Sequence, residues 1–228
     1  MSKNLELAEK YLSVLQQHDL AAIYGGSPEY SGIFLPSASD KYWKSNIKTM
    51  IVGKEPRGWL DNSCAGKLSQ KFELDDVVAS LKQHEESLRV DRPKSKFIQF
   101  YRKSCIALNS EKKLGESIIW SNLICISRNK KSPVGSKSFD KVKALSEQLL
   151  RAQIEVLKPT VILFVTGTSY DKYIRAFFPE RAASIRIVPG KLWSFKIDDA
   201  QCFRTSHPQW GDGAKHRDQA LSLAMGDT

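Results

Sequence analysis

An uninterrupted apolar run at residues 161–165 constrains the fold of this chain more than any other feature. A strand with one face in water alternates apolar and polar residues, whereas a strand that is covered on both faces is apolar throughout. Strands of the second kind occur in parallel sheets that carry helices on both faces. Residues 160–167 are therefore predicted to form a buried strand of an α/β domain.

The rest of the chain alternates between strand-like and helix-like segments. Apolar runs predict strands at residues 47–52, 118–127, 185–188, 192–197 and 202–206. Helical spacing predicts helices at about residues 3–17, 73–89, 95–109, 139–157, 168–178 (capped by Thr168 or Ser169) and 214–224, with a short one beginning at Ser39-Asp40. This order predicts a three-layer α/β/α sandwich with a mainly parallel central sheet. We expect one domain over residues 1–228, of which residues 1–30 form an N-terminal helical extension.

The chain is strongly basic, because 35 Lys and Arg residues against 25 Asp and Glu give a formal net charge of +10. An excess of this sign predicts an anionic partner, most often nucleic acid. Phosphate contacts are predicted for basic residues in the loop after the strand at 118–127 and in the last helix: Lys130, Lys131, Lys137, Lys215 and Arg217. For any single lysine of this group, an ordinary solvated charge is the alternative.

The four cysteines predict neither a metal ion nor an iron–sulfur cluster. Cys64, Cys105, Cys125 and Cys202 form no CxxC pair, and no histidine lies at ligand spacing from any of them. Widely spaced thiols are typical of core residues in a reducing compartment. No apolar run reaches the length of a membrane span, and the N-terminus has the pattern of a polar helix rather than a signal peptide. We therefore expect a cytoplasmic or nucleoid-associated monomer that needs no cofactor.

Three predicted strands carry a polar residue, either within the strand or directly after it. Glu55 follows the strand at 47–52, Asn122 interrupts the apolar strand at 118–127, and His207 follows the last strand. Parallel sheets bind ligands at the carboxyl ends of their strands, so these side chains are candidates for one site. A solvated glutamate, a structural amide cap and a surface histidine are the respective alternatives.

Four segments, in this order along the chain, resemble motifs of the uracil-DNA glycosylase superfamily. Gly53-Lys54-Glu55-Pro56 resembles its first motif of glycine, variable residue, acid and proline. Asn122-Leu123-Ile124-Cys125-Ile126-Ser127-Arg128 resembles the base-reading strand. Residues 161–167 with Thr168-Ser169-Tyr170 resemble the later strand–glycine–serine–tyrosine segment, and His207-Pro208 resembles the opening of the histidine–proline–serine motif. The resemblance extends from about residue 47 to the C-terminal helix and implies the fold of that superfamily.

The resemblance also implies a role for each of the three polar residues. Glu55 would orient water and stabilise the sugar cation, Asn122 would hydrogen-bond the pyrimidine edge, and His207 would stabilise the charge that develops on the base O2. The target nucleotide has to leave the stack, because its glycosidic bond is inaccessible inside the duplex. Further base-binding candidates are Gly53, Lys54, Arg57 and Gly58.

Two departures from the family pattern bear on the substrate and on DNA contacts. Gln209 replaces a serine, and Trp210 or Gly211 stands at the wedge that fills the gap left by a flipped base; loop packing is the alternative role of Trp210. Arg57-Gly58 stands where uracil-specific members have a tyrosine that blocks pyrimidine C5. A glycine there opens the pocket beside C5, and an arginine offers donors to a polar substituent. Alternatively, the glycine serves a tight turn and the arginine faces a phosphate.

The sequence therefore predicts a monofunctional, cofactor-free DNA glycosylase that hydrolyses the N-glycosidic bond of a flipped pyrimidine and leaves an abasic site. A modified pyrimidine, such as the hypermodified cytosine of phage DNA, would imply antiviral defence, whereas uracil would imply base-excision repair. The rival class is a catalytically inactive nucleic-acid-binding protein with the same fold, against which Glu55 and His207 argue. A nucleotide-processing enzyme is disfavoured, because the sequence has no Gly-rich Walker pattern.

Overall fold

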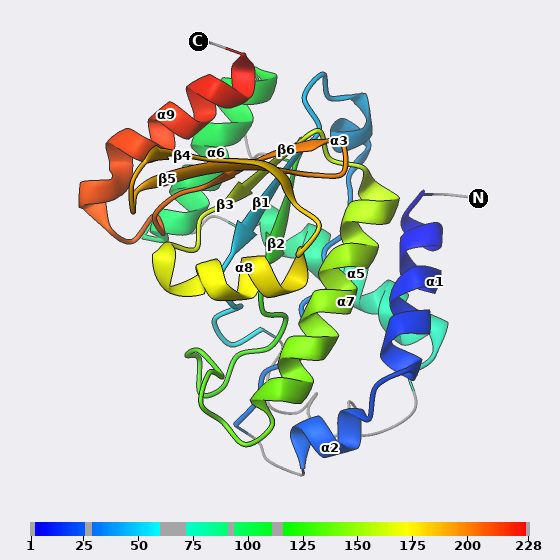
Figure 1. Ribbon diagram of the computed structural model, residues 1–228. Coiled ribbons are helices and arrows are strands. Elements are labelled where there is room, and N and C mark those ends of the chain that lie inside the picture. Colours follow the sequence, from blue (N-terminus) through cyan, green and yellow to red (C-terminus); the bar gives the residue numbers. More distant parts are fainter. Residues whose placement is uncertain (1–2, 26–28, 60–71, 91–93, 111–115, 227–228) are drawn as a thin grey trace. The chain divides into compact units, whose positions relative to one another are not determined.

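The structure is a computed structural model that describes residues 3–25, 29–59, 72–90, 94–110 and 116–226 (Figure 1). The chain divides into two compact units. Unit 1 comprises residues 1–37, 54–84 and 121–157, and unit 2 comprises residues 38–53, 85–120 and 158–228. Both units are built from segments that are distant in the sequence, so neither corresponds to a continuous stretch of chain.

A six-stranded mixed sheet confirms the predicted α/β class. The strands are β1 (Thr49–Gly53), β2 (Ile118–Asn122), β3 (Val161–Phe164), β4 (Ala182–Val188), β5 (Leu192–Ile197) and β6 (Ala200–Arg204), in the spatial order β2-β1-β3-β6-β5-β4. β1, β3 and β6 are parallel, while β5 is antiparallel to both β6 and β4. The antiparallel part follows from chain length, because Asp198 and Asp199 alone connect β5 to β6 and a parallel crossover needs about a dozen residues.

The helices lie close to the predicted positions, except that residues 20–24 form an additional helix that was not predicted. They are α1 (Lys3–Gln16), α2 (Leu20–Tyr24), α3 (Asp40–Lys44), α5 (Leu74–Arg89), α6 (Lys96–Asn109), α7 (Phe139–Leu157), α8 (Asp171–Phe177) and α9 (Ala214–Met225). Ser39 caps α3, as its position before the helix predicts. The predicted cap at residue 168 or 169 is wrong, because a 3₁₀ turn over Thr168–Tyr170 precedes α8 and neither element has a side-chain cap.

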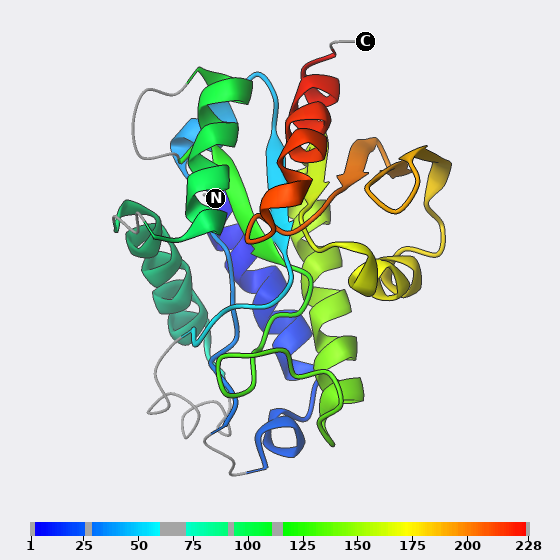
Figure 2. The same ribbon diagram turned by 90° about the vertical axis from the view of Figure 1, so that its left-hand side faces the viewer.

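The core of unit 2 lies between the sheet and the pair of helices α6 and α9. Register places Ile51, Leu163 and Phe203 side by side across β1, β3 and β6. These side chains and apolar residues of α6 and α9 form one buried cluster. Both ribbon views show the two helices on the same face of the sheet (Figures 1 and 2). Each large apolar side chain buried here stabilises the unit by about 1.5–3 kcal/mol.

Helix α8 covers the opposite face of the sheet in unit 2. Phe164 of β3 contacts Phe178 at the end of α8, with ring centroids 6.3 Å apart, and stacks on Phe195 of β5 at 5.7 Å. Ile174 and Phe177 of α8 are also buried. Unit 2 therefore has helices on both faces of its sheet, which explains why β3 is apolar along its whole length.

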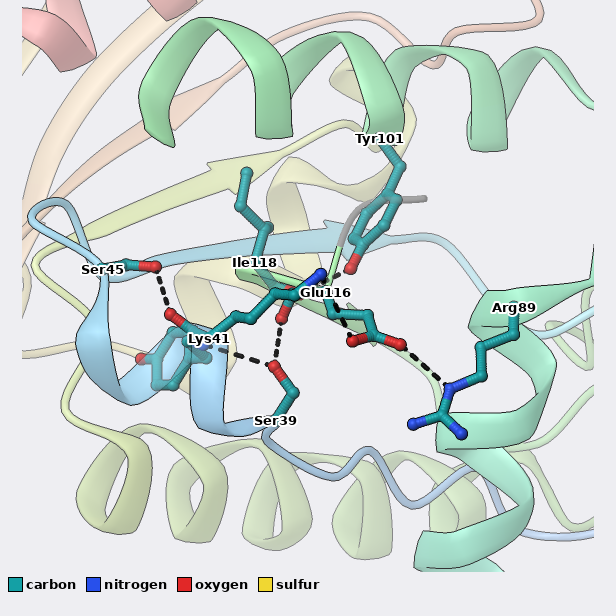
Figure 3. Close-up of polar contacts among 8 residues, drawn as sticks. Ser39, Lys41, Ser45, Arg89, Tyr101, Glu116 and Ile118 are labelled. Atoms are coloured by element: carbon teal, nitrogen blue, oxygen red, sulfur yellow. Dashed lines mark hydrogen bonds and ion pairs between the residues drawn. The ribbon is translucent and has the colours of Figure 1, made fainter. Parts of the chain in front are cut away.

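The start of β2 is held by polar contacts from three helices (Figure 3). Ser39 Oγ donates to the carbonyl of Glu116 at 2.6 Å, and the Glu116 carboxylate pairs with Arg89 at 3.0 Å. Tyr101 of α6 donates its buried hydroxyl to the carbonyl of Ile118 at 2.7 Å. The buried hydrogen bond contributes more to stability than the exposed ion pair, because water screens the latter.

In unit 1 the N-terminal helix packs along α7 (Figure 1). Leu7, Tyr11 and Leu15 of α1 are buried. The Tyr11 hydroxyl donates to the carbonyl of Pro36 at 2.9 Å, and burial raises the pKa of this tyrosine well above its usual value. The N-terminal segment is therefore part of the apolar packing of unit 1.

Three of the four cysteines are buried in the core, as the sequence predicts: Cys105, Cys125 and Cys202. Burial raises the pKa of the Cys125 thiol to about 12, so it stays protonated at neutral pH. Cys64 and the loop at 60–71 lie outside the described residues. No helix in the described part of the chain is long and apolar enough to cross a membrane.

Candidate active site

The strand predicted at residues 118–127 ends at Asn122, and this correction defines the candidate site. The following residues use their backbone groups to bind other loops rather than a neighbouring strand. The N–H of Ile124 donates to the carbonyl of Lys54 at 2.8 Å, and the carbonyl of Cys125 accepts the N–H of Phe34 at 2.8 Å. The asparagine segment is thereby attached directly to the residue before Glu55.

Two serines extend this attachment into a network. Ser127 donates its N–H to Ser31 Oγ at 2.9 Å, and its own Oγ accepts the N–H of Gly58 at 3.3 Å. The N–H of Gly32 donates to the carbonyl of Trp59 at 2.8 Å. Residues 31–34, 54–59 and 123–127 thus form one hydrogen-bonded assembly in unit 1, which we call the interlaced loops.

Glu55 lies in the interlaced loops, two residues after the end of β1. Gly53 is the last residue of β1 and is buried, Lys54 and Glu55 are half-buried, and Pro56 is buried. Because Pro56 has no N–H, the strand stops and the chain turns at this point. The local sequence therefore places a carboxylate on a backbone segment that hydrogen bonds hold in position.

Asn122, the last residue of β2, carries a buried donor that no described residue binds. Its side chain is 6% exposed, and within the described part of the chain Nδ2 has no hydrogen-bond partner. A buried polar group without a partner costs about 1–3 kcal/mol. A structural cap would donate its amide hydrogens to the backbone, and no described residue accepts one from Nδ2 of Asn122.

Gly58 has a backbone conformation that explains the glycine by itself. Its φ is +69°, in the left-handed region that side chains rarely occupy, and an added Cβ would lie 3.1 Å from Cγ of Lys130. The adjoining Arg57 is exposed. The tight-turn alternative is thus realised at Gly58, and the opening beside pyrimidine C5 stays a prediction.

The predicted DNA-contacting loop begins with a two-residue turn. Arg128 and Lys131 exchange N–H···O bonds of 2.9 Å in both directions, while Asn129 and Lys130 have φ of +50° and +59°. Arg128 pairs with Glu29 at 2.7 Å, and this contact lowers the pKa of the glutamate. Lys130 and Lys131 are exposed, as are Lys137 and Lys215, so these four lysines can reach a solvent-borne phosphate.

His207 belongs to unit 2, where its ring is held from two sides. Nδ1 accepts the backbone N–H of Gln209 at 3.2 Å, and the ring stacks on Phe97 of α6 with centroids 6.3 Å apart and planes at 27°. An accepting Nδ1 requires that Nε2 carries the proton of the neutral ring. The histidine is thereby prepared as a donor through Nε2, which is the form that could stabilise a negative charge.

Arg217 is a structural residue, which corrects its prediction as a phosphate contact. It is 7% exposed, and its Nη1 donates to Ser206 Oγ at 2.9 Å and to the carbonyls of Trp210 and His207 at 3.0 and 3.3 Å. A guanidinium can make these bonds from α9, whereas it cannot at the same time extend into solvent. Burial lowers the pKa of Arg217. The residue fixes the loop that carries His207.

Trp210 projects from this loop. Its side chain is 49% exposed, and an added Cβ on Gly167, whose φ is +70°, would lie 3.4 Å from the indole ring. Gln209 is exposed beside it. A half-exposed indole supported on one edge is compatible with both predicted roles, a DNA wedge and loop packing.

Sequence reasoning missed several residues that position these side chains. Ser31 and Ser127 bind the interlaced loops, Phe97 supports His207, and Gly213 leaves room for Ser206, whose side chain a Cβ at residue 213 would overlap. Each lies far in the chain from the group it serves, except Gly213, which is close in sequence to Ser206. Local periodicity carries no signal for such contacts, because it reports burial and not the identity of a partner.

The described residues contain no group of three or more His, Cys, Asp or Glu side chains that could hold a metal ion. No model of a protein family matches the chain, and a search of curated proteins finds no match. The resemblance to uracil-DNA glycosylases therefore rests on the four motifs, and the function has to be argued from the residues.

Proposed function

We propose that the protein is a monofunctional DNA glycosylase with a uracil-DNA glycosylase-like α/β/α fold. It flips a modified pyrimidine out of DNA and hydrolyses the N-glycosidic bond, leaving an abasic site. Hypermodified cytosine of phage DNA is the proposed substrate class, and antiviral defence is the corresponding role. No cofactor takes part in this proposal.

The observation that carries the proposal is the buried, unused Nδ2 of Asn122 in a segment bonded to the acidic motif. Nδ2 has no partner among the described residues, and the Ile124–Lys54 hydrogen bond of 2.8 Å connects the asparagine segment to Glu55. An amide offers both a donor and an acceptor, which is the pattern that the edge of a pyrimidine requires. A hydrogen bond from Nδ2 to a base would compensate the cost of burying this donor without a partner.

The proposed chemistry separates two charges. As the base–sugar bond breaks, the sugar becomes oxocarbenium-like and the base becomes anionic. The Glu55 carboxylate stabilises the cation and orients the attacking water, while His207 donates through Nε2 to the base O2. One water molecule is consumed: its hydroxyl group is added to the sugar carbon, and its remaining proton is added to the released base. Lys54 is the residue beside the acid that would support a lyase step, and we assign it no such role.

Uracil is the second candidate substrate, and the backbone of Gly58 favours it. The φ of +69° accounts for a glycine at this position without an opening beside C5. If Arg57 faces a phosphate, Arg57→Ala weakens the binding of every DNA equally. If it contacts a polar C5 substituent, Arg57→Ala reduces excision of the substituted base alone, by one or two charged hydrogen bonds of about 1.5–3 kcal/mol each.

The test is incubation with DNAs that carry uracil, mismatched thymine, 5-hydroxymethylcytosine or glucosylated 5-hydroxymethylcytosine, in single and double strands. Abasic sites are detected by alkaline cleavage. Excision of one of these bases by the wild type and not by Glu55→Gln supports the proposal. Glu155→Gln, a matched change at an exposed glutamate that pairs with Lys10, serves as the control and retains activity. DNA binding without excision of any base identifies the inactive binding protein instead.

A borohydride experiment tests the monofunctional assignment. A lyase forms a Schiff base between a lysine and the opened sugar, and borohydride reduction converts it to a stable protein–DNA cross-link. We expect no cross-link above the level of Lys54→Arg. A cross-link that disappears in Lys54→Arg would assign the lyase step to Lys54.

A further inference from the structure

Unit 2 contains a polar pocket that the proposed glycosylase chemistry does not use. The pocket has a volume of about 210 Å³ and lies between α8, the 3₁₀ turn before it and the strands β4, β5 and β6. Its lining consists of Thr168, Asp171, Arg175, Arg186, Val188, Gly190, Leu192, Trp193 and Arg204. Three of these residues, Arg175, Arg186 and Arg204, bring positively charged guanidinium groups to one small pocket.

The charges that line the pocket do not balance. Arg204 is 4% exposed and binds Asp171 through two contacts, Nε to Oδ1 at 2.8 Å and Nη2 to Oδ2 at 3.0 Å. Asp171 is the one acidic side chain among the described lining residues. Arg175 and Arg186 therefore leave the pocket with a net charge of about +2.

The pKa directions agree with an excess of positive charge. Burial lowers the pKa of Arg204, and the charges of Arg175 and Arg186 lower it further, against the effect of Asp171. Burial raises the pKa of Asp171, while all three arginines act in the opposite direction. An anion in the pocket would relieve the repulsion among the three cations.

Two of the three guanidinium groups are held in place before any ligand arrives. Arg204 is fixed by Asp171 and also donates to the carbonyl of Lys191 at 3.3 Å. Arg175 lies over the ring of Trp193, 4.6 Å from its centroid, and that indole stacks on Phe195 at 4.2 Å. Preorganised guanidinium groups lose little conformational entropy when their planar fork of N–H donors binds two oxygen atoms of a phosphate group.

We propose that this pocket binds a phosphate monoester dianion, through Arg175, Arg186 and Arg204 with Thr168 as a hydroxyl donor. The net charge matches a dianion better than the single charge of an internal phosphodiester or a carboxylate. The volume holds a phosphate group and part of a sugar. The monoester comes either from a free 5′-mononucleotide or from the phosphorylated end of a strand, and the pocket does not depend on the glycosylase activity.

A purely structural cluster is the alternative explanation. In that case Arg175 only covers Trp193, Arg204 only pairs with Asp171, and Arg186 is a solvated side chain of the exposed strand β4. This alternative predicts stability effects without any effect on anion binding. A measurement of anion binding therefore distinguishes the two explanations, whereas a melting temperature does not.

The experiment measures binding of inorganic phosphate, dCMP and short single-stranded oligonucleotides with and without a 5′-phosphate, by calorimetry. The proteins are the wild type, Arg175→Gln, Arg186→Gln and the control Lys172→Gln. Lys172 is an exposed cation of α8 that lies over Tyr173 at 5.0 Å and does not line the pocket. Melting temperatures confirm that each variant is folded.

We expect phosphate and dCMP to bind the wild type, each arginine change to weaken them about tenfold or more, and Lys172→Gln to change them less than twofold. If Arg175→Gln and Arg186→Gln weaken binding of the 5′-phosphorylated oligonucleotide and leave the unphosphorylated one unchanged, the pocket takes a strand end. If they weaken only phosphate and dCMP, it takes a free nucleotide. No binding of phosphate or dCMP by the folded wild type, or losses in Lys172→Gln equal to those in the arginine variants, would overturn the proposal. Excision activity enters none of these readouts, so the two proposals fail separately.

Discussion

The backbone N–H of Gln209 donates a hydrogen bond to Nδ1 of His207 at 3.2 Å. This bond selects the tautomer of the neutral ring, because a nitrogen that accepts cannot also carry the proton. Stacking on Phe97 determines the plane of the ring. The histidine of the last motif is thus prepared as a neutral donor by its own loop and by one helix.

His207→Ala should slow the chemical step and leave DNA binding nearly intact. A donor to developing charge acts on the transition state, and its loss costs about 10²–10³-fold in rate. Single-turnover excision measures this effect. His18→Ala is the matched control, since His18 is a partly exposed histidine of unit 1 that contacts Gln148 at 3.0 Å. Equal rates for His207→Ala and the wild type would disprove the leaving-base role.

Glu55→Gln should lower excision by orders of magnitude while DNA binding persists or tightens. The amide keeps the shape of the side chain and removes the charge that stabilises the sugar cation. A rate comparison with a fluorescence binding titration separates the two effects. Loss of both activity and binding would instead indicate that Glu55 maintains the interlaced loops.

Asn122→Leu should abolish excision without loss of stability. The change removes a buried donor that has no partner among the described residues, so the free energy of unfolding should stay the same or rise by about 1–3 kcal/mol. Asn109→Leu is the contrasting control, because Asn109 Nδ2 donates to the carbonyl of Ile47 and to Ser117, and its loss should destabilise the protein. Thermal unfolding of both variants measures these two changes in stability. A marked destabilisation by Asn122→Leu would indicate that Asn122 has a structural role instead.

Gly58→Ala should destabilise the protein by about 1–2 kcal/mol through its positive φ and the close side chain of Lys130. Gly135→Ala provides the comparison, since Gly135 has φ of +85° and no atom within 4 Å of an added Cβ. If Gly58 serves the turn alone, excision of plain and substituted bases falls by the same factor. A loss confined to substituted bases would show that the glycine also opens the pocket.

The salt dependence of DNA binding should separate the four exposed lysines from Arg217. Each lysine that contacts a phosphate contributes about one to the log–log slope of affinity against salt, so Lys130→Gln, Lys131→Gln, Lys137→Gln and Lys215→Gln should each lower the slope. Arg217→Gln should instead lower the melting temperature, because it breaks three hydrogen bonds to the histidine loop. A DNA affinity that does not change with salt concentration would exclude phosphate contacts by these lysines.

The sequence by itself determined most of the secondary structure and the identity of the candidate residues. Apolar runs and helical spacing report which residues face a core, so the strand at 161–164 and the helix at 139–157 could be read locally. Short connections also dictate the antiparallel pairing of β5 with β6. These features depend on residues that are close together in the chain.

Only the tertiary structure decided what the polar groups bind. The strand ends at Asn122 because Ile124 donates to Lys54, which is 70 residues away in the chain, and Arg217 is internal because its acceptors lie in another loop. The arginine pocket likewise unites β4, β6 and α8. A hydrogen bond or an ion pair requires a specific partner at about 3 Å, and nothing in local periodicity specifies which distant residue will supply it.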